Sequence, residues 1–178
     1  MTKPTRLEGR IWVLTGPEGQ LYDDIDTDQI FHNAHLHITE TAQMGAYALG
    51  NLEGWKDFPQ KAKPGDILVA GRNFGAGSSR QQAVDCFVAL GVAAILAPSY
   101  SAIYFRNAVN TGFPVLRGDG LDRLAAEGLL RSGDEIEIDH LSGRGRNVTR
   151  NETIFLEPMS AVQREIYEAG NLFRMKRN

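Results

Sequence analysis

Short apolar runs, each bounded by glycine, proline or polar residues, recur along the chain and are typical of buried strands. This pattern predicts strands at residues 9–15, 66–70, 92–97, 113–116, 134–139 and 151–156. Apolar residues at helical spacing predict helices from residue 39 to about 52, at 81–90, 101–111 and 121–130, and from 158 to about 169. The polar segments at 22–38 and 141–146 are predicted to be a loop and a turn.

The central elements follow one another closely enough to form a βαβ unit. Strand 66–70, helix 81–90 and strand 92–97 leave room for a parallel pair joined by a right-handed crossover. Residues 134–139 alternate strictly between charged and apolar, which predicts a strand with one solvated face. There is no internal repeat or low-complexity linker, so we expect a single α/β domain over residues 1–178.

Composition narrows the functional classes. The chain has 178 residues, with 19 Lys and Arg against 22 Asp and Glu, for a net charge of −3. A mildly acidic chain does not favour broad nucleic-acid binding, which requires a clustered basic surface. Residues 1–10 lack the apolar core of a secretory signal, and no apolar run is long enough to span a bilayer. We therefore expect a cytoplasmic protein without a membrane partner.

Cys86 is the single cysteine. A disulfide within the chain is thus excluded, and so is an iron–sulfur cluster held by this chain alone, since such clusters take three or four thiolates. Because Cys86 lies near the apolar face of the predicted helix 81–90, we expect a buried structural thiol.

The loop between the two parallel strands has the chemistry of an anion pocket. Gly75 and Gly77 allow a sharp turn, Ser78 and Ser79 supply hydroxyls, and Arg80 supplies a two-pronged donor for carboxylate or phosphate. The helix that follows adds free N–H groups. The loop is neither a Walker A motif nor a nucleophile elbow. An alternative interpretation has equal weight, in which the loop only caps the helix and Arg80 is a surface residue.

Two further clusters lie in the segment 22–38. The carboxylates at 23–28 are compatible with a metal site, a base or a partner for a basic group, although a solvated acidic loop is favoured. Three of the four histidines, His32, His35 and His37, fall close together. Their spacing is unlike that of zinc ligand pairs, so surface or substrate contacts are favoured, and we expect no metal site.

The order of three segments, 24–30, 71–80 and 104–112, resembles the family of 3-isopropylmalate dehydratase small subunits, which is similar to the swivelling C-terminal domain of aconitase. The resemblance extends over nearly the whole chain, including residues 168–170 in the closing helix. It implies an α/β fold, a swivelling β/β/α domain with a small mixed sheet or barrel-like core and flanking helices.

This resemblance also implies a hydro-lyase that acts in leucine biosynthesis. Such an enzyme isomerises a hydroxy-acid with two or three carboxylates by dehydration and rehydration. A separate large subunit would carry a 4Fe-4S cluster that accepts the leaving hydroxyl. The chain would contain no cofactor of its own and would be active only with that partner.

The resemblance assigns roles to the loop residues. Ser78 matches the base that removes the proton next to a carboxylate, and its alkoxide would need the positive charge of Arg80 and of the helix N-terminus. Ser79 and Arg80 match substrate-carboxylate contacts. Asp28 matches a carboxylate that orients the site.

The loop 32–38 departs from the family pattern, which tends to have Arg or Tyr near Ala34 and His35. Leu36 would meet an alkyl group, and His35 or His37 a carboxylate. Isopropylmalate, homoaconitate and a methylated malate therefore all remain as substrates. Two other hypotheses also remain, a non-enzymatic dicarboxylate-binding module and a histidine-based metal protein.

Overall fold

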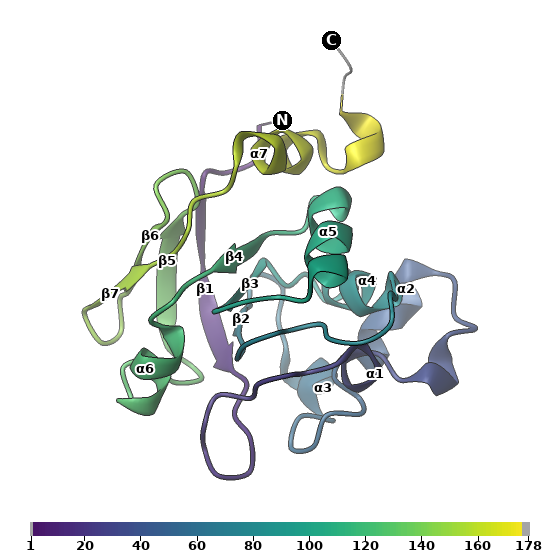
Figure 1. Cartoon of the computed structure of the whole chain (residues 1–178), viewed down its shortest axis with the longest axis horizontal. Helices are drawn as coiled ribbons and strands as arrows, with labels where there is room; N and C mark the ends of the chain where they lie inside the picture. Colours follow the sequence, from purple (N-terminus) through teal and green to yellow (C-terminus); the bar gives the residue numbers. More distant parts are fainter. Residues whose placement is uncertain (1, 176–178) are drawn as a thin grey trace.

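The computed structural model describes residues 2–175 and contains one sheet in the order β4-β3-β2-β1-β5-β6-β7 (Figure 1). Its strands are β1 (Arg6–Val13), β2 (Ile67–Val69), β3 (Ala94–Ala97), β4 (Val115–Arg117), β5 (Glu135–Asp139), β6 (Arg144–Asn147) and β7 (Glu152–Phe155). The strands β1 to β4 are parallel, and β5 to β7 are antiparallel. The expected mixed sheet and parallel βαβ unit are thus confirmed.

Strand β1 joins the two halves of this sheet. Its C-terminal residues 11–13 pair in parallel with β2, whereas its N-terminal residues 6–10 pair antiparallel with β5. The sheet also curls, because the chain after β7 returns to β4, where Glu157 N donates to Arg117 O at 2.8 Å. A mixed, curled sheet follows from these two features.

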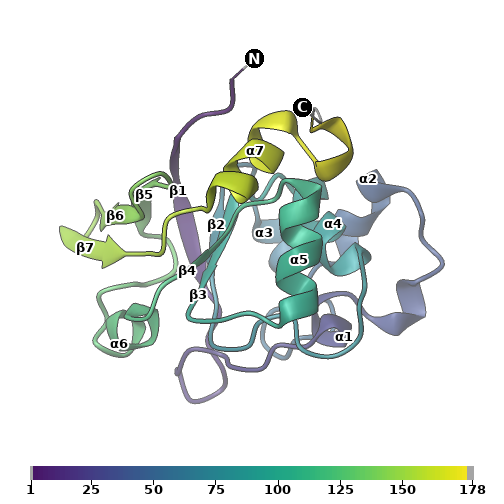
Figure 2. The same cartoon turned by 45° about the horizontal axis from the view of Figure 1, so that its top comes forward.

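Helices cover both faces of the sheet (Figure 2). They are α1 (Thr27–Ile30), α2 (Thr41–Met44), α3 (Phe58–Lys61), α4 (Gln82–Ala89), α5 (Ala102–Thr111), α6 (Leu121–Ala126) and α7 (Ala161–Ala169), with 3₁₀ turns η1 (Asn33–His35), η2 (Gly45–Tyr47) and η3 (Leu172–Arg174). None of these helices has the length and apolar character that crossing a membrane requires, within residues 2–175.

Alternation along the central strands creates two cores. Leu68 and Ile95 point to the face covered by α4 and α5, where they join Phe74, Phe87 and Tyr104. Their neighbours in β2 and β3 point to the opposite face and pack with residues of α6, β5 and α7. Because alternate side chains leave a strand on opposite sides, both faces of a short apolar strand are buried.

Three sequence predictions were wrong in detail. The helix expected from residue 39 to about 52 is divided into α2 and η2, and Leu49 then adopts a left-handed conformation with φ 57°. The loop expected at 22–38 contains α1 and η1. The turn expected at 141–146 contains most of β6, so that β7 pairs with β6 instead of directly with β5.

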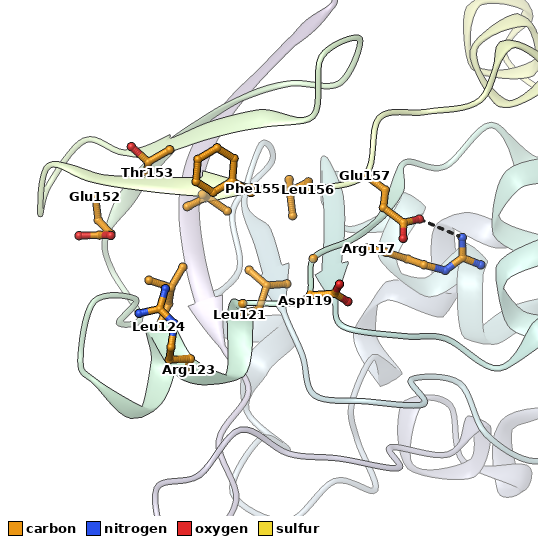
Figure 3. Close-up of a pocket in the computed structure, with 13 residues that line it drawn as sticks. Arg117, Asp119, Leu121, Arg123, Leu124, Glu152, Thr153, Phe155, Leu156 and Glu157 are labelled. Atoms are coloured by element: carbon orange, nitrogen blue, oxygen red, sulfur yellow. Dashed lines mark ion pairs between the residues drawn. The ribbon is translucent and has the colours of Figure 1, made fainter.

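A groove lies between α6 and the edge strand β7 (Figure 3). Its floor is apolar and includes Leu121, Leu124 and Leu156, and the ion pair between Arg117 and Glu157, at 3.7 Å, lies at one end. None of the predicted site residues lines this groove.

Candidate active site

The acidic segment and the glycine-serine loop, almost fifty residues apart in the chain, lie side by side. Asp26 and Ala76 form a parallel β-bridge. Thr27 N donates to Ala76 O at 2.9 Å, and Gly75 N donates to Ile25 O at 2.8 Å. This short pairing brings the beginning of α1 against the loop that precedes α4.

Most carboxylates of the acidic segment build this junction. Asp23 Oδ1 accepts from Arg72 N at 2.7 Å, and Asp24 Oδ1 accepts from Asn73 Nδ2 at 3.0 Å. The carboxylate of Asp26 caps α1 in a capping box. These three residues therefore shape the backbone.

Gly75 lets the loop approach α5 closely. Its φ is 82°, and a Cβ at this position would run into the ring of Tyr104. The Tyr104 hydroxyl in turn donates to Ala83 O, in α4, at 2.9 Å. The glycine thus fits a place where both the backbone angle and the neighbouring ring exclude a side chain.

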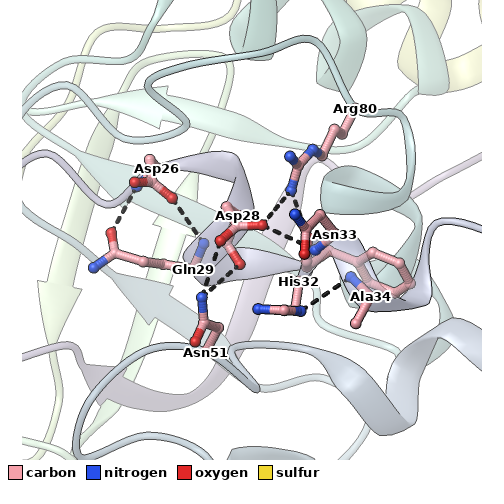
Figure 4. A network of polar contacts seen from close by, with 9 residues as sticks. Asp26, Asp28, Gln29, His32, Asn33, Ala34, Asn51 and Arg80 are labelled. Atoms are coloured by element: carbon pink, nitrogen blue, oxygen red, sulfur yellow. Dashed lines mark hydrogen bonds and ion pairs between the residues drawn. The ribbon is translucent and has the colours of Figure 1, made fainter.

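Asp28 holds Arg80 by an ion pair. Arg80 Nη1 lies 2.9 Å from Asp28 Oδ1 and also donates to Phe31 O at 3.1 Å (Figure 4). The arginine side chain is only 16% exposed. No group in the described part of the chain bonds to its Nε or Nη2. Nε and Nη2 together form the side-on edge of the guanidinium, which can donate two parallel hydrogen bonds to a carboxylate. This edge is therefore left for a ligand.

Asp28 is itself held by several donors. Asn33 N donates to Oδ1 at 2.9 Å, and Asn51 Nδ2 donates to Oδ2 at 3.0 Å. The hydrogen bond from Arg80 is the main cause that lowers the pKa of Asp28; burial acts in the opposite direction, and the Asn33 N–H and the charge of Arg80 add to the lowering. Asp28 is thus ionised at neutral pH and suits an orienting anion better than a proton donor.

The two serines differ in their surroundings. Ser79 Oγ accepts a hydrogen bond from Asn107 Nδ2, on α5, at 3.1 Å. Ser78 is exposed, and within residues 2–175 its hydroxyl is bonded to neither Asp28 nor Arg80. The structure therefore joins Asp28 with Arg80 directly, and places Ser78 beside them only through the short loop.

Comparison with known proteins identifies the family. Residues 23–117 match the family model described as the aconitase C-terminal domain. A 3-isopropylmalate dehydratase small subunit from Pyrobaculum calidifontis is 42% identical over 156 residues, which cover 88% of this chain and 92% of the relative. The chain belongs to the family of 3-isopropylmalate dehydratase small subunits.

Other members of this family agree in length and fold. An isopropylmalate/citramalate isomerase small subunit from Methanocaldococcus jannaschii is 32% identical over 166 residues, covering 93% of this chain and 90% of the relative. A crystal structure titled 3-isopropylmalate dehydratase from the same organism superposes with a TM-score of 0.81 at 32% identity and covers 96% of this chain and 92% of that one. The predicted family and fold are confirmed.

The histidine-rich loop of this family member is ordered by local contacts. His32 Nδ1 accepts from Ala34 N at 3.0 Å, so the neutral ring carries its proton on Nε2. The ring of His35 stacks on Tyr47 with centroids 4.0 Å apart. Leu36 is 38% exposed, and its carbonyl accepts from Gln82 Nε2, at the start of α4, at 3.4 Å. The loop thus lies against the end of α4 that follows Arg80.

The histidines do not assemble into a metal site in this structure. Across residues 2–175, no three His, Cys, Asp or Glu side chains are grouped closely enough to hold a metal ion. Cys86 is buried as predicted, its Sγ lies 3.7 Å from Ala83 O, and burial raises the pKa of its thiol. A buried, protonated thiol does not fit a cluster ligand.

Sequence reasoning missed two residues of the site. Asn107, the partner of Ser79, lies within the segment 104–112 that carries the family resemblance, although nothing in that segment indicated its contact. Asn51, the partner of Asp28, follows a glycine in a stretch that was expected to be helical. No sequence signal marked it, because its role arises from the turn at Leu49.

Proposed function

We propose that the chain is the carboxylate-binding and proton-transferring subunit of a two-chain hydro-lyase, which isomerises 3-isopropylmalate or a close analogue by dehydration and rehydration. The small-subunit family implies a large-subunit partner. Because Cys86 does not fit a cluster ligand, we assign the 4Fe-4S cluster to that partner, where it would supply a Lewis acid.

One observation carries the proposal, the ion pair between Asp28 and Arg80 beside an exposed Ser78. Asp28 and Phe31 O use only Nη1 of Arg80, so that Nε and Nη2 are presented together to an incoming carboxylate. The hydroxyl of Ser79 is a second donor to the same group. A substrate held there would lie with its carbon next to the carboxylate near Ser78.

Ser78 would move the proton. Its alkoxide removes the proton from the carbon next to the bound carboxylate, and the C–H electron pair forms the C=C bond as the hydroxyl leaves the neighbouring carbon. In the rehydration step water supplies a hydroxyl to the carbon that lost the proton, and the protonated Ser78 gives its proton to the carbon that lost the hydroxyl. A serine hydroxyl is a weak acid, so the alkoxide requires the positive charge of Arg80 nearby.

The loop 32–38 would select the substrate. Leu36 would meet an alkyl group, and His35 or His37 a second carboxylate. Isopropylmalate carries both features. The Methanocaldococcus relative is named for both isopropylmalate and citramalate. We therefore choose four test compounds: isopropylmalate, homocitrate, dimethylmalate and citramalate.

Co-expression with candidate large subunits tests the proposal. The complex is purified without oxygen and assayed on the four compounds by the absorbance of the unsaturated intermediate. We expect turnover of at least one compound by the complex and none by the lone chain. Turnover by the lone chain would overturn the proposal, as would an intact, cluster-loaded complex that turns over none of the four.

A serine variant tests the role of Ser78. Ser78→Ala is expected to assemble normally and to lose about 10²–10⁴-fold in turnover, the usual contribution of a proton-transferring side chain. Ser142→Ala is the matched control, since Ser142 is also exposed but lies in the β5–β6 turn. Equal activity of the two variants would show that Ser78 is not the base.

A further inference from the structure

The two carboxylate oxygens of Asp28 have different partners. Oδ1 accepts from Arg80 Nη1 and from Asn33 N, each at 2.9 Å. Oδ2 accepts from Asn51 Nδ2 at 3.0 Å, and Figure 4 shows the amide pointing at this oxygen. No other described group bonds to Oδ2. The terminal bond of an aspartate side chain rotates over a broad range, so a carboxylate keeps one orientation only when both oxygens are held.

The backbone is bent to bring Asn51 to this place. Leu49 has a φ of 57°, an unfavourable angle for a residue with a side chain, while its N–H donates to Ile30 O at 2.8 Å. Leu49 and Leu52 are fully buried, and their burial offsets this strain. The turn therefore attaches the segment after η2 to the end of α1, with Asn51 beside Asp28.

We infer that Asn51 is a positioning residue, which acts through Asp28 to fix the orientation of the Arg80 guanidinium toward substrate. The inference rests on the proposed function. Without the Asn51 amide, Oδ1 keeps its two donors but Oδ2 is no longer held. The carboxylate is then less restrained, and it holds Nη1 less firmly while the side-on edge faces the ligand. The charged or titratable groups facing Asp28 are Arg80, from the loop before α4, and His32, from the segment before η1.

Asn51→Asp separates positioning from packing, because it keeps the size of the side chain and replaces the donor with an acceptor. At neutral pH two carboxylates then face each other, and we expect kcat/KM to fall about 10-fold or more, mainly through KM. As the pH falls, the pair binds one shared proton, which restores a donor toward Asp28. The ratio of variant to wild-type kcat/KM should therefore rise as the pH is lowered.

The control is Asn151→Asp, which makes the same charge change in the exposed β6–β7 turn, on the opposite side of the molecule from α1 (Figure 1). The ratio of its kcat/KM to that of wild type should stay near one at every pH. An Asn51→Asp ratio that is also flat and near one would overturn the inference. Asn51→Ala has no donor at any pH, so its kcat/KM should be reduced and should not recover at low pH.

A second readout keeps this inference apart from the proposed function. The pKa of Asp28 in the full isolated chain is measured by NMR titration of its side-chain carboxyl carbon. Loss of a hydrogen bond to the ionised form should raise this pKa in Asn51→Ala. If the wild-type complex has no activity, the proposed function fails and this titration still tests Asn51. An unchanged pKa of Asp28 would overturn the inference by itself.

Discussion

Replacing Asp28 with asparagine removes the charge that holds Arg80 and leaves the side-chain size unchanged. The two side chains are 37% and 16% exposed, so the pair is neither fully buried nor fully solvated. An exposed ion pair contributes about 0.2–1 kcal/mol, and a buried hydrogen bond to a charged group about 1.5–3 kcal/mol. We therefore expect Asp28→Asn to lower the free energy of unfolding by about 1–2 kcal/mol, which corresponds to roughly 2–8 °C in Tm for a chain of this size.

The same substitution should weaken substrate binding. Arg80 would lose the anion that keeps its Nη1 occupied, and its side-on edge would no longer be held toward the ligand. Each factor of ten in kcat/KM corresponds to about 1.4 kcal/mol, so a loss of about 10- to 100-fold is expected in the complex with the large subunit. Most of the loss should appear in KM, and thermal unfolding with steady-state kinetics measures both effects.

Asp122→Asn is the matched control for this prediction. Asp122 pairs with Arg72 at the same 2.9 Å, but the two side chains are 39% and 63% exposed. Asp122→Asn should lower the free energy of unfolding by at most about 1 kcal/mol and leave KM unchanged. The reasoning would be refuted if the two variants lowered Tm equally, or if Asp28→Asn had the KM of wild type.

Two predictions concern stability alone. Gly75→Ala should lower the free energy of unfolding by about 2–4 kcal/mol, because the added methyl meets Tyr104. Gly77→Ala, at φ 91° and with neighbours only at ordinary van der Waals distance, should lower it by about 1–2 kcal/mol. Equal losses in chemical denaturation would contradict this explanation. Burial acts to raise the pKa of Asp66, but hydrogen bonds led by that from Arg10 outweigh it and lower the pKa. The stabilisation by Asp66 should thus be complete above its unfolded pKa of about 3.9 and disappear as pH falls through the lower folded value. Denaturation between about pH 6 and 2 should then show a weaker pH dependence for Asp66→Asn than for wild type.

The parts of the fold that could be predicted are those with a strong apolar period. Strands β2 and β3 and helices α4 and α5 combine buried faces with clear glycine or proline boundaries. Strand β6 could not be found in this way, because the residues that it turns inward include Gly145 and Asn147, which are not apolar. The α-helix expected after residue 39 ends at Met44, continues as the 3₁₀ turn η2, and gives way to the left-handed Leu49, so tertiary packing overrides local helical propensity.

The candidate site residues were identified from the resemblance of the sequence to the family. Residues that this resemblance does not indicate could not be identified. The structure pairs Asp28 with Arg80, a contact that the resemblance did not specify. The contact of Asn51 with Asp28 crosses 23 positions of the chain and depends on a strained turn, so no local pattern could reveal it. The roles of all the candidate site residues stay predictions: Ser78, Ser79, Arg80, Asp28, His35 and Leu36.

The double pairing of β1 has a consequence for the time order of folding. Residues 11–13 can pair as soon as β2 has been synthesised, but residues 6–10 wait for β5, at 135–139. At the usual pace of translation this leaves the beginning of β1 without its partner strand for roughly ten seconds. β1, which leaves the ribosome before the other six strands of this sheet, is therefore among the last to be completed. During that interval its open edge is the place where a nascent chain of this fold is most exposed to mispairing.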